Sequence, residues 1–379
     1  MRRILVITGH AAGADLKATI LFQAEALAQM GHAVQIVTVD YSRLRVLLKR
    51  VMPPVAANET YEVSPGLKGY VWMPLFHPVN LPIKPLVAIL ARVYPMMLDG
   101  FVRSAACAAD TIIVESGTGM LLAPALKRLN PNAHMMLMMC DLMETLPCSA
   151  VVVEKANATI PLFDLVTYPA QAMRDNLKTA RKALFLPQGL DKRAFARTVP
   201  SPFSQGRQAI SIGDMLFDAQ TLTTLAQAYP DWTFHLFGRN ARLSIPLDNV
   251  IAHGEVQFAS LVPYLQHADI GIAPYREAPF VSYISQSSLK LVQYSYCQLP
   301  IVAPDFAAAG REHVCPYRPG DSASVVAAFA AAMALPRAGI DTRQIRDWQE
   351  NAQLLLRYFD ELGVGPTALQ PGPAEALPE

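Results

Sequence analysis

The first forty residues combine short apolar runs with one longer segment of helical spacing. Residues 4–8 form a nearly continuous apolar run, which is typical of a strand buried on both faces. Apolar side chains recur at helical spacing over 20–28, Gly31 follows as a helix stop signal, and 34–39 is again apolar. This strand, helix, strand order predicts a parallel sheet with right-handed crossovers.

Short apolar segments continue the alternation along both halves of the chain. They occupy residues 111–114, 135–139, 165–168, 183–186, 209–212, 233–237, 250–252, 270–273 and 301–303. Between 187 and 208 the pattern gives way to prolines, glycines and polar residues, which are typical of a linker. We therefore expect an α/β protein with two Rossmann-like doubly wound domains facing a cleft. Ligands of open α/β sheets bind at the carboxyl ends of the strands, so the cleft is the expected site.

The same pattern predicts the domain boundaries. We expect one domain over 1–195 and a second over 196–345. Helical spacing returns near the C-terminus, and 346–362 is expected to form a helix that packs back on the N-terminal domain. Residues 363–379 are rich in Pro, Ala and Gly and are expected to be disordered.

Composition excludes one class of partner. With 32 Lys and Arg against 31 Asp and Glu, the net charge is +1, so binding to nucleic acid through overall charge is excluded. Charged residues make up only 17%, below the roughly 25% of typical soluble domains. The chain is therefore either unusually buried or in contact with something apolar.

The cysteines and the N-terminus indicate a compartment. The five cysteines show no Cys-x-x-Cys spacing, as expected of reduced thiols in a cytosolic protein. The apolar run after Arg3 is too short for a secretory signal, and no apolar stretch reaches the roughly 18 residues of a membrane span. We expect a cytoplasmic protein without a spanning helix.

Several common motifs do not fit. The first loop, 9–14, lacks the G-x-G-x-x-G spacing, although Asp40 follows the second strand as in dinucleotide-binding folds. Neither a P-loop nor a G-x-S-x-G motif occurs. A dehydrogenase, a P-loop NTPase and an α/β-hydrolase are thus disfavoured.

A helix that begins near Ser288 is the most informative segment. The serine can cap the first turn, where free N–H groups and the helix dipole favour a phosphate. Lys290 adds a positive charge suited to a diphosphate, and Gln293 can bind ribose hydroxyls or phosphate oxygens. The alternative is that Lys290 is an ordinary solvated helix lysine.

This segment resembles a known family. Residues 287–304 contain S-S-x-K-L-x-Q-Y and L-P-x-V-x-P, a pattern similar to the nucleotide-binding helix of GT-B glycosyltransferases. With glutamine at 293, the chain further resembles the xanthan-type β-glucuronosyltransferases of glycosyltransferase family 70. Shorter similarities lie at 9–10, 17–18, 114–117, 140–142, 213–218 and 273–275. The first loop departs from the family, because it lacks extra basic residues.

The resemblance implies an activity and its partners. The family adds β-glucuronic acid from a UDP-sugar to a polyprenyl-diphosphate-linked oligosaccharide, a step of exopolysaccharide biosynthesis. The GT-B fold then assigns acceptor binding to the N-terminal domain and nucleotide-sugar binding to the C-terminal domain. No cofactor is expected, because the UDP-sugar is a substrate.

The resemblance also implies roles for individual residues. Met215 and Tyr275 would pack around the uridine and diphosphate, and Leu289 would lie beside Lys290. Met215 and Leu289 could instead be ordinary core residues. The expected nucleotide-sugar site consists of Met215, Tyr275, Ser288, Leu289, Lys290 and Gln293.

Asp141 is the expected catalytic base. It follows the apolar strand at 135–139, so it lies at the ligand edge of the sheet, where a carboxylate can take the proton of an acceptor hydroxyl. It could instead cap the segment that follows. Glu144 is a second candidate, and His10, just past the first strand, is a rival base or a substrate contact.

The expected reaction needs no metal ion. No Asp-x-Asp or His/Asp cluster has metal-ligand spacing, so Lys290 and the helix dipole would stabilise the leaving group. Direct attack assisted by a single base implies inversion at the donor carbon. Lys17 and Glu115 are further candidate substrate contacts, and Arg276 or Lys290 could hold a glucuronate carboxylate.

Two stretches of the N-terminal half indicate contact with a membrane. Basic and apolar residues are interspersed at 43–50, and 69–103 carries aromatic, methionine and leucine residues among Lys and Arg. Such a surface suits anionic lipid and a polyprenyl acceptor, at the inner face of the cell membrane. The alternative is a set of core helices with solvated basic edges.

Three other functions use the same layout. A hexosyltransferase of another polysaccharide or glycolipid pathway would share the motifs, and a nucleotide-sugar sensor would bind its ligand without catalysis. A UDP-hexose 2-epimerase would need additional carboxylates and histidines at the cleft, which the sequence does not assign.

Overall fold

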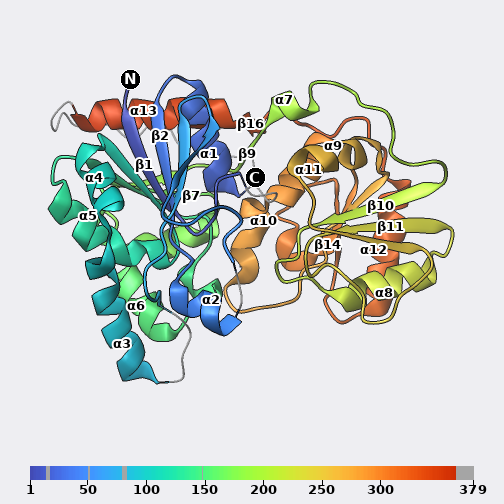
Figure 1. The fold of residues 1–379 in the computed structure, drawn as a ribbon. Coiled ribbons are helices and arrows are strands. Elements are labelled where there is room, and N and C mark those ends of the chain that lie inside the picture. The colour runs from blue at the N-terminus through green and yellow to red at the C-terminus, as the bar shows by residue number, and fades with distance from the viewer. Residues whose placement is uncertain (14–17, 50–51, 79–82, 147, 364–379) are drawn as a thin grey trace.

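The chain forms two halves in the computed structural model, and each half is built on its own sheet (Figure 1). The structure describes residues 1–13, 18–49, 52–78, 83–146 and 148–363. Lys17 and the tail at 364–379 lie outside the described residues. Both halves have the α/β architecture predicted from the sequence.

An eight-stranded sheet is the centre of the N-terminal half. Its order is β3-β4-β2-β1-β5-β6-β7-β8, and all neighbours are parallel except β3 and β4. The strands are β1 (Arg3–Thr8), β2 (Ala33–Thr38), β3 (Thr60–Ser64), β4 (Leu67–Val71), β5 (Thr111–Glu115), β6 (His134–Met138), β7 (Leu165–Tyr168) and β8 (Ala183–Phe185). The carboxyl ends of β1, β5 and β6 therefore meet at one edge.

Helices cover both faces of this sheet. The α-helices are α1 (Thr19–Gln29), α2 (Arg43–Lys49), α3 (Lys84–Val93), α4 (Gly100–Ala108), α5 (Ala123–Leu129), α6 (Ala150–Asn157) and, from the C-terminus, α13 (Trp348–Gly363). Short 3-10 helices are η1 (Tyr94–Met97), η2 (Thr118–Leu122), η3 (Met143–Thr145), η4 (Ile160–Leu162) and η5 (Gln171–Leu177). Ile4 and Val6 share a core with α1 and α13, whereas Leu5 and Ile7 share one with α3 to α6. The central strands are apolar at most positions because both faces are buried, and their polar residues lie at the strand ends.

A six-stranded parallel sheet is the centre of the C-terminal half, in the order β12-β11-β10-β13-β14-β15. The strands are β10 (Arg207–Ile212), β11 (Trp232–Phe237), β12 (Val250–Gly254), β13 (Ile270–Ile272), β14 (Ile301–Pro304) and β15 (Val314–Tyr317). Its helices are α8 (Ala219–Ala228), α9 (Phe258–His267), η6 (Val281–Tyr283), α10 (Ile284–Ser287), α11 (Leu289–Tyr296), η7 (Asp305–Ala307) and α12 (Ser322–Ala334). In Figure 1, α10 and α11 lie on the side of this half that faces the N-terminal half.

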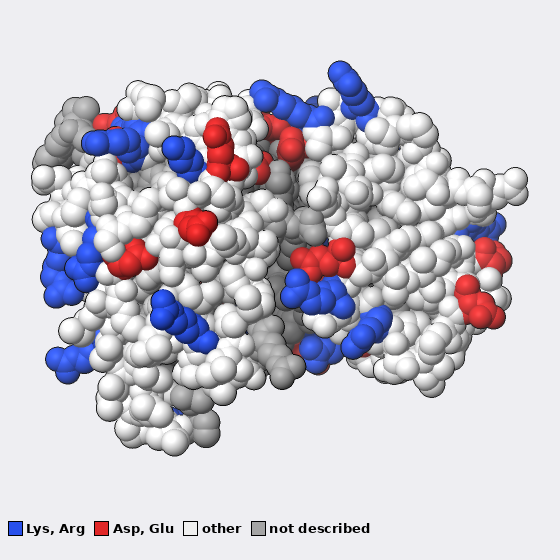
Figure 2. All heavy atoms as spheres, viewed as in Figure 1, with Lys and Arg blue, Asp and Glu red and all other residues white. Residues whose placement is uncertain are grey.

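No single helix among the described residues is long and apolar enough to cross a membrane. Two helical segments, Lys84–Met97 and Gly100–Ala108, meet that test only together, and they are bent by 70° relative to each other. On the face seen in Figure 2, charged side chains are scattered and form no continuous patch of one sign.

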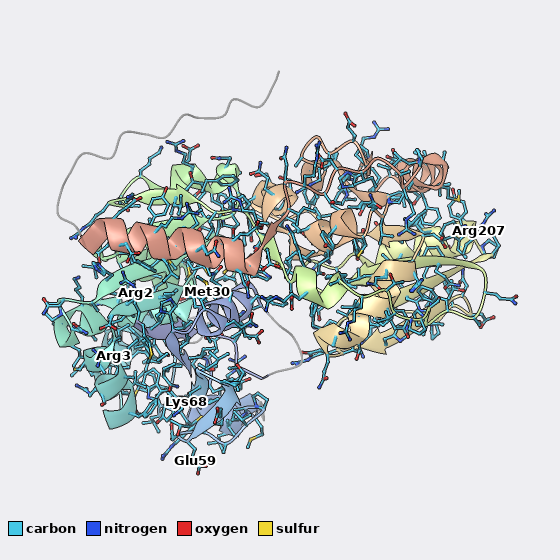
Figure 3. All side chains as sticks on the ribbon, turned by 90° about the horizontal axis from the view of Figure 1, so that it is seen from above. Arg2, Arg3, Met30, Glu59, Lys68 and Arg207 are labelled. Carbon is cyan, nitrogen blue, oxygen red and sulfur yellow. The ribbon has the colours of Figure 1, made fainter. Side chains whose placement is uncertain are left out.

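Two passages of the chain connect the halves, and they lie side by side. The first contains β9 (Gly189–Leu190) and α7 (Lys192–Phe195), and the second contains β16 (Arg346–Asp347), which pairs with β9. The sequence predicted a helix from 346, but Arg346 and Asp347 form this short strand and α13 begins at Trp348. Figure 3 shows α13 running along the N-terminal half above Arg2, which pairs with Asp360.

Candidate active site at the cleft

Contacts between the halves concentrate on the segment 283–287 of the C-terminal half. The hydroxyl of Tyr283 lies 2.8 Å from Oδ1 of Asp141, on the loop after β6. Farther along, Oε1 of Gln286 accepts a hydrogen bond of 2.6 Å from the Gln171 amide. Nε2 of Gln188 donates to the Ser287 carbonyl at 3.0 Å. The start of α11 is thereby held close to the carboxyl edge of the N-terminal sheet.

Asp141 is fixed by its backbone as well as by Tyr283. The Oγ of Ser116 accepts hydrogen bonds from the amides of Cys140 (3.0 Å) and Asp141 (3.2 Å). The Asp141 side chain does not cap η3. The N-cap residue of η3 is Leu142, and no side chain forms a capping hydrogen bond there. Burial raises the pKa of Asp141, although the Tyr283 hydroxyl and His10 act in the opposite direction. A raised pKa makes the ionised carboxyl a stronger proton acceptor than an ordinary aspartate.

Glu115 and His10 lie beside Asp141 at the same edge. Glu115 is buried at the end of β5, where it accepts a hydrogen bond from Thr8 and lies 3.7 Å from Nε2 of His10. Burial raises the pKa of Glu115, against the effect of His10. The His10 side chain is 45% exposed and therefore accessible to solvent. The structure thus brings together three of the residues singled out from the sequence.

Two other sequence candidates lie apart from this cluster. Glu144 is exposed and accepts a hydrogen bond of 2.9 Å from Asn157 on α6. Arg276 is exposed on the loop after β13, and its backbone amide donates to the Leu216 carbonyl at 2.7 Å. Among the described residues no side chain pairs with the Arg276 guanidinium.

The start of α11 has the geometry of an anion site. The Oγ of Ser288 caps the helix by accepting from the Leu291 amide at 3.4 Å. The buried Tyr275 hydroxyl lies 2.6 Å from the same Oγ. The cap therefore orients the free N–H groups of the first turn and fixes the tyrosine that borders it.

Lys290 is enclosed by two loops of the C-terminal half. Its Nζ lies 4.6 Å from the centroid of the Tyr275 ring. A Cβ on Gly213, whose φ is +73°, would lie 3.7 Å from the same Nζ. Burial lowers the pKa of Lys290 to about 7, and only the nearby Asp214 carboxylate opposes this effect. The ammonium group is thus poorly compensated, and a bound diphosphate would supply the missing negative charge.

The remaining residues of the expected nucleotide-sugar site differ in burial. Gln293 is 5% exposed, and no described residue forms a hydrogen bond with its side-chain amide. Met215 is 46% exposed, which excludes a core role. Leu289 is half-buried and packs against the apolar cluster of the N-terminal half.

Sequence reasoning missed Tyr283 and Arg311. The Arg311 guanidinium is half-buried, donates to the Ser285 carbonyl, and has no acidic partner among the described residues. Burial lowers its pKa, and it lies close enough to Tyr275 for the two to interact electrostatically. Arg311 follows β14 in the chain, and a cation in the loop after a strand of the C-terminal sheet is a candidate ligand contact that the sequence alone could have indicated. The sequence around Tyr283 forms no motif.

Metal ligands do not gather at this site in the part of the chain that the structure describes. No group of three His, Cys, Asp or Glu side chains there could hold a metal ion.

Family models match both halves of the chain. Residues 6–169 match the N-terminal domain of the glucuronosyltransferase GumK, and residues 213–338 match the glycosyl transferases group 1 family. The chain is also 29% identical to the UDP-glucuronate:glycolipid 2-beta-glucuronosyltransferase of Xanthomonas campestris pv. campestris. That alignment of 384 residues covers 99% of this chain and 94% of the relative.

Solved structures share the fold at low sequence identity. An α,α-trehalose-6-phosphate synthase from Burkholderia multivorans is 13% identical, with a TM-score of 0.61 over 96% of this chain and 97% of that one. The synthase from Burkholderia xenovorans with glucose-6-phosphate is 12% identical, with a TM-score of 0.63 over 94% and 100%. AviGT4, a glycosyltransferase of avilamycin A biosynthesis, is 13% identical, with a TM-score of 0.55 over 97% and 99%. Together with the cleft geometry, these findings identify the chain as a glycosyltransferase of the GT-B fold that resembles the xanthan-type β-glucuronosyltransferases.

Proposed function

We propose that this chain transfers glucuronic acid from UDP-glucuronate to a glycolipid acceptor, with inversion at the donor carbon and without a metal ion. The observation that carries the proposal is the approach of a partly buried carboxyl, Asp141, to the capped cationic start of α11 through Tyr283 and Tyr275. The Xanthomonas relative, whose name gives UDP-glucuronate as donor and a glycolipid as acceptor, supports the choice of substrates.

Asp141 would act as the general base. As the acceptor hydroxyl attacks the anomeric carbon, its proton passes to the free carboxylate oxygen of Asp141 and the new carbon–oxygen bond forms. The bond between the anomeric carbon and the diphosphate breaks, and its electron pair stays on UDP. A single displacement of this kind inverts the anomeric configuration, and the base contributes about 10²–10⁴-fold to the rate.

Lys290 and the first turn of α11 would hold the diphosphate. The helix N-terminus offers free N–H groups, and the poorly compensated Lys290 ammonium supplies a full positive charge. Both stabilise the charge that develops on the leaving UDP. Because these groups already supply positive charge, we propose that activity persists in EDTA.

The proposed donor also carries a carboxylate, which needs a cation. Arg276 is exposed on the loop that joins Tyr275 to η6, and its guanidinium is unpaired among the described residues. Arg276 is therefore the preferred candidate for glucuronate recognition, because Lys290 is already engaged at the diphosphate.

The acceptor would reach the site from a membrane surface on α2, α3 and the loops beside them. Its exposed apolar side chains are Leu44, Leu47, Leu48, Met52, Leu75, Ile83, Leu86, Ile89 and Met96. Basic residues accompany them at Arg43, Arg45, Lys84 and Arg92. In Figure 2 the surface over α3 is largely free of charged side chains. We propose that this surface binds the inner face of the cell membrane and receives a polyprenyl-diphosphate-linked oligosaccharide of exopolysaccharide biosynthesis.

The transfer reaction tests the proposed activity. Purified protein is incubated with a lipid-linked oligosaccharide and with UDP-glucuronate, UDP-glucose or UDP-galacturonate, and the product linkage is assigned by NMR. We expect turnover with UDP-glucuronate, a β-linked product and full activity in EDTA. Turnover with UDP-glucose alone would establish a hexosyltransferase instead. Binding of UDP without any turnover would indicate a nucleotide-sugar sensor.

Vesicle binding tests the membrane surface. Leu47→Ser should reduce sedimentation with vesicles that contain phosphatidylglycerol, because this side chain is 76% exposed among basic residues. Ile245→Ser is the matched control, since Ile245 is 73% exposed but lies in the C-terminal half. Equal losses in the two variants, or none in either, would contradict a membrane surface at α2 and α3.

A further inference from the structure

Tyr283 joins the two halves at the base. It is only 1% exposed, and its hydroxyl lies 2.8 Å from Oδ1 of Asp141 and 3.0 Å from Oγ1 of Thr145. Tyr283 belongs to η6 in the C-terminal half, whereas Asp141 and Thr145 follow β6 in the N-terminal half. A separation of the halves would therefore remove both contacts.

The direction of the hydrogen bonds follows from the available protons. The Thr145 hydroxyl also lies 2.8 Å from the Leu142 carbonyl, which can only accept. An ionised Asp141 can only accept as well, so the single proton of the Tyr283 hydroxyl goes to Asp141. Burial and the neighbouring carboxylate raise the pKa of Tyr283, so this hydroxyl remains a donor at any working pH.

One oxygen of Asp141 stays available for the acceptor. Tyr283 occupies Oδ1, and no described residue donates to Oδ2. A carboxylate held at one oxygen keeps its orientation and presents the second oxygen in a fixed position. Such positioning has a large effect on proton transfer, which requires the donor and acceptor atoms to be within hydrogen-bond reach.

We propose that Tyr283 is a positioning residue that orients Asp141 for proton abstraction and does so only while the two halves are docked. The inference rests on the proposed role of Asp141 as the base. It adds that the C-terminal half, which binds the donor, completes the base in the N-terminal half. The base is then fully assembled only while the Tyr283 contacts across the two halves are in place.

Removal of the Tyr283 hydroxyl should change the titration of Asp141 in a known direction. The groups that face Asp141 are His10 after β1, Glu115 of β5, the adjacent Cys140, and Tyr275 and Tyr283 of the other half. The Tyr283 hydrogen bond favours the ionised carboxyl, so its loss raises the pKa of Asp141 further. The acid limb of the kcat profile should therefore move to higher pH.

The test compares Tyr283→Phe with Tyr229→Phe. The control removes a phenol hydroxyl from the same half, where it donates to the Val326 carbonyl at 3.1 Å. We expect Tyr283→Phe to lower kcat by about 10- to 100-fold, as for a lost hydrogen bond to a charged group, with UDP affinity unchanged. The acid limb should shift upward, while Tyr229→Phe keeps the wild-type profile. The rates are divided by the folded fraction measured by circular dichroism at each pH, so the limb also reads out a partly unfolded variant.

The Asp141→Asn variant separates this inference from the proposed function. If Asp141→Asn abolishes turnover but Tyr283→Phe keeps both kcat and the acid limb, Tyr283 has no positioning role and the base assignment stands. If Asp141→Asn keeps turnover, the base assignment itself is overturned. In the double variant, Tyr283→Phe should add almost nothing to Asp141→Asn, because both act on one group. Additive losses would show that Tyr283 acts elsewhere.

Discussion

The two edges of the cleft bury charges of opposite sign. At the N-terminal edge, burial raises the pKa of Asp141 and Glu115. At the C-terminal edge, burial lowers the pKa of Lys290 and Arg311. Each environment disfavours the charge that it contains, so the first edge is ready to take up a proton and the second to take up an anion.

The separation of these groups matters for the chemistry. A direct ion pair between Asp141 and Lys290 would lower the pKa of the base and neutralise the cation needed by the diphosphate. Among the described residues no ion pair joins the acids of one edge to the cations of the other, and two buried tyrosines, Tyr275 and Tyr283, lie between them. Each charged site is thus in contact with an uncharged tyrosine, Asp141 with the Tyr283 hydroxyl and Lys290 with the Tyr275 ring, and neither site is neutralised by the other.

The largest effect is expected from the N-terminal edge. Asp141→Asn should lower kcat by about 10²–10⁴-fold, because it removes the proton acceptor, and leave UDP affinity unchanged. Initial rates and calorimetric UDP titration measure the two quantities. His10→Asn is the companion variant: near-normal kcat in Asp141→Asn with a collapse in His10→Asn would move the base to His10.

The C-terminal edge should respond in binding as well as in rate. Lys290→Met keeps the length of the side chain but removes its charge, and we expect UDP affinity to fall by about 10- to 100-fold. Calorimetry measures the change, with Lys155→Met as a control for loss of an exposed charge on α6. An unchanged Kd for UDP would show that Lys290 does not bind the diphosphate. The C-terminal edge would then not be the anion-binding edge.

Nucleotide binding should also depend on pH through Lys290. The pKa of this group is lowered to about 7 in the free protein, and the diphosphate favours its protonated form. Binding above pH 7 is then coupled to proton uptake, so the affinity should fall by up to about tenfold per pH unit as the pH rises. Titration at pH 8 in buffers of different ionisation enthalpy measures the uptake, and Lys290→Arg should show none. Equal proton uptake in both proteins would contradict this linkage.

The smallest effect concerns acid stability of the C-terminal half. His235 bonds His253 at 2.9 Å and Gln208 at 2.8 Å, and burial lowers the pKa of His235 to about 4 and also lowers that of His253. Because the folded pKa values lie below the unfolded value of 6.5, stability is fully present above pH 6.5 and falls as the pH drops toward 4. Asp141 and Glu115, with raised pKa values, oppose this loss.

Thermal unfolding at two pH values tests whether the pair His235 and His253 makes the protein sensitive to acid. His253→Gln should reduce the difference in unfolding free energy between pH 7.5 and pH 5, because the buried pair then has one fewer group to protonate. The control His134→Gln alters a histidine of the N-terminal sheet that lies outside this pair. A similar reduction in both variants would mean that the histidine pair does not determine the acid sensitivity.

The sheets were predictable for a simple physical reason. A strand that is buried on both faces must be apolar at nearly every position, and β1, β5 and β6 all follow this rule. The position of Asp141 at the cleft edge follows in turn, since parallel strands end together. Ser288 was predictable as well, because a cap needs only local sequence.

Contacts between the two halves could not be predicted in this way, because no local pattern in the sequence marks them. Tyr283 and Asp141 are 142 residues apart, and their hydrogen bond depends on how the two halves dock. Glu144 follows Asp141 by three residues, yet η3 directs it to Asn157 on α6. At 346–347 the helical spacing continues while the backbone pairs with β9, because a two-residue strand is too short for a period to be visible.

The pairing of β9 with β16 determines how this molecule can move. Gly189 packs so closely on Trp348 that a Cβ there would lie 2.7 Å from the indole ring, and Trp348 stacks on Phe22 with ring centroids 5.7 Å apart. Two adjacent passages restrict the motion more than one, because twisting about either requires breaking their shared ladder. We therefore expect the halves to rotate mainly about an axis along that ladder. Each catalytic cycle would then open and close the cleft along one reproducible path.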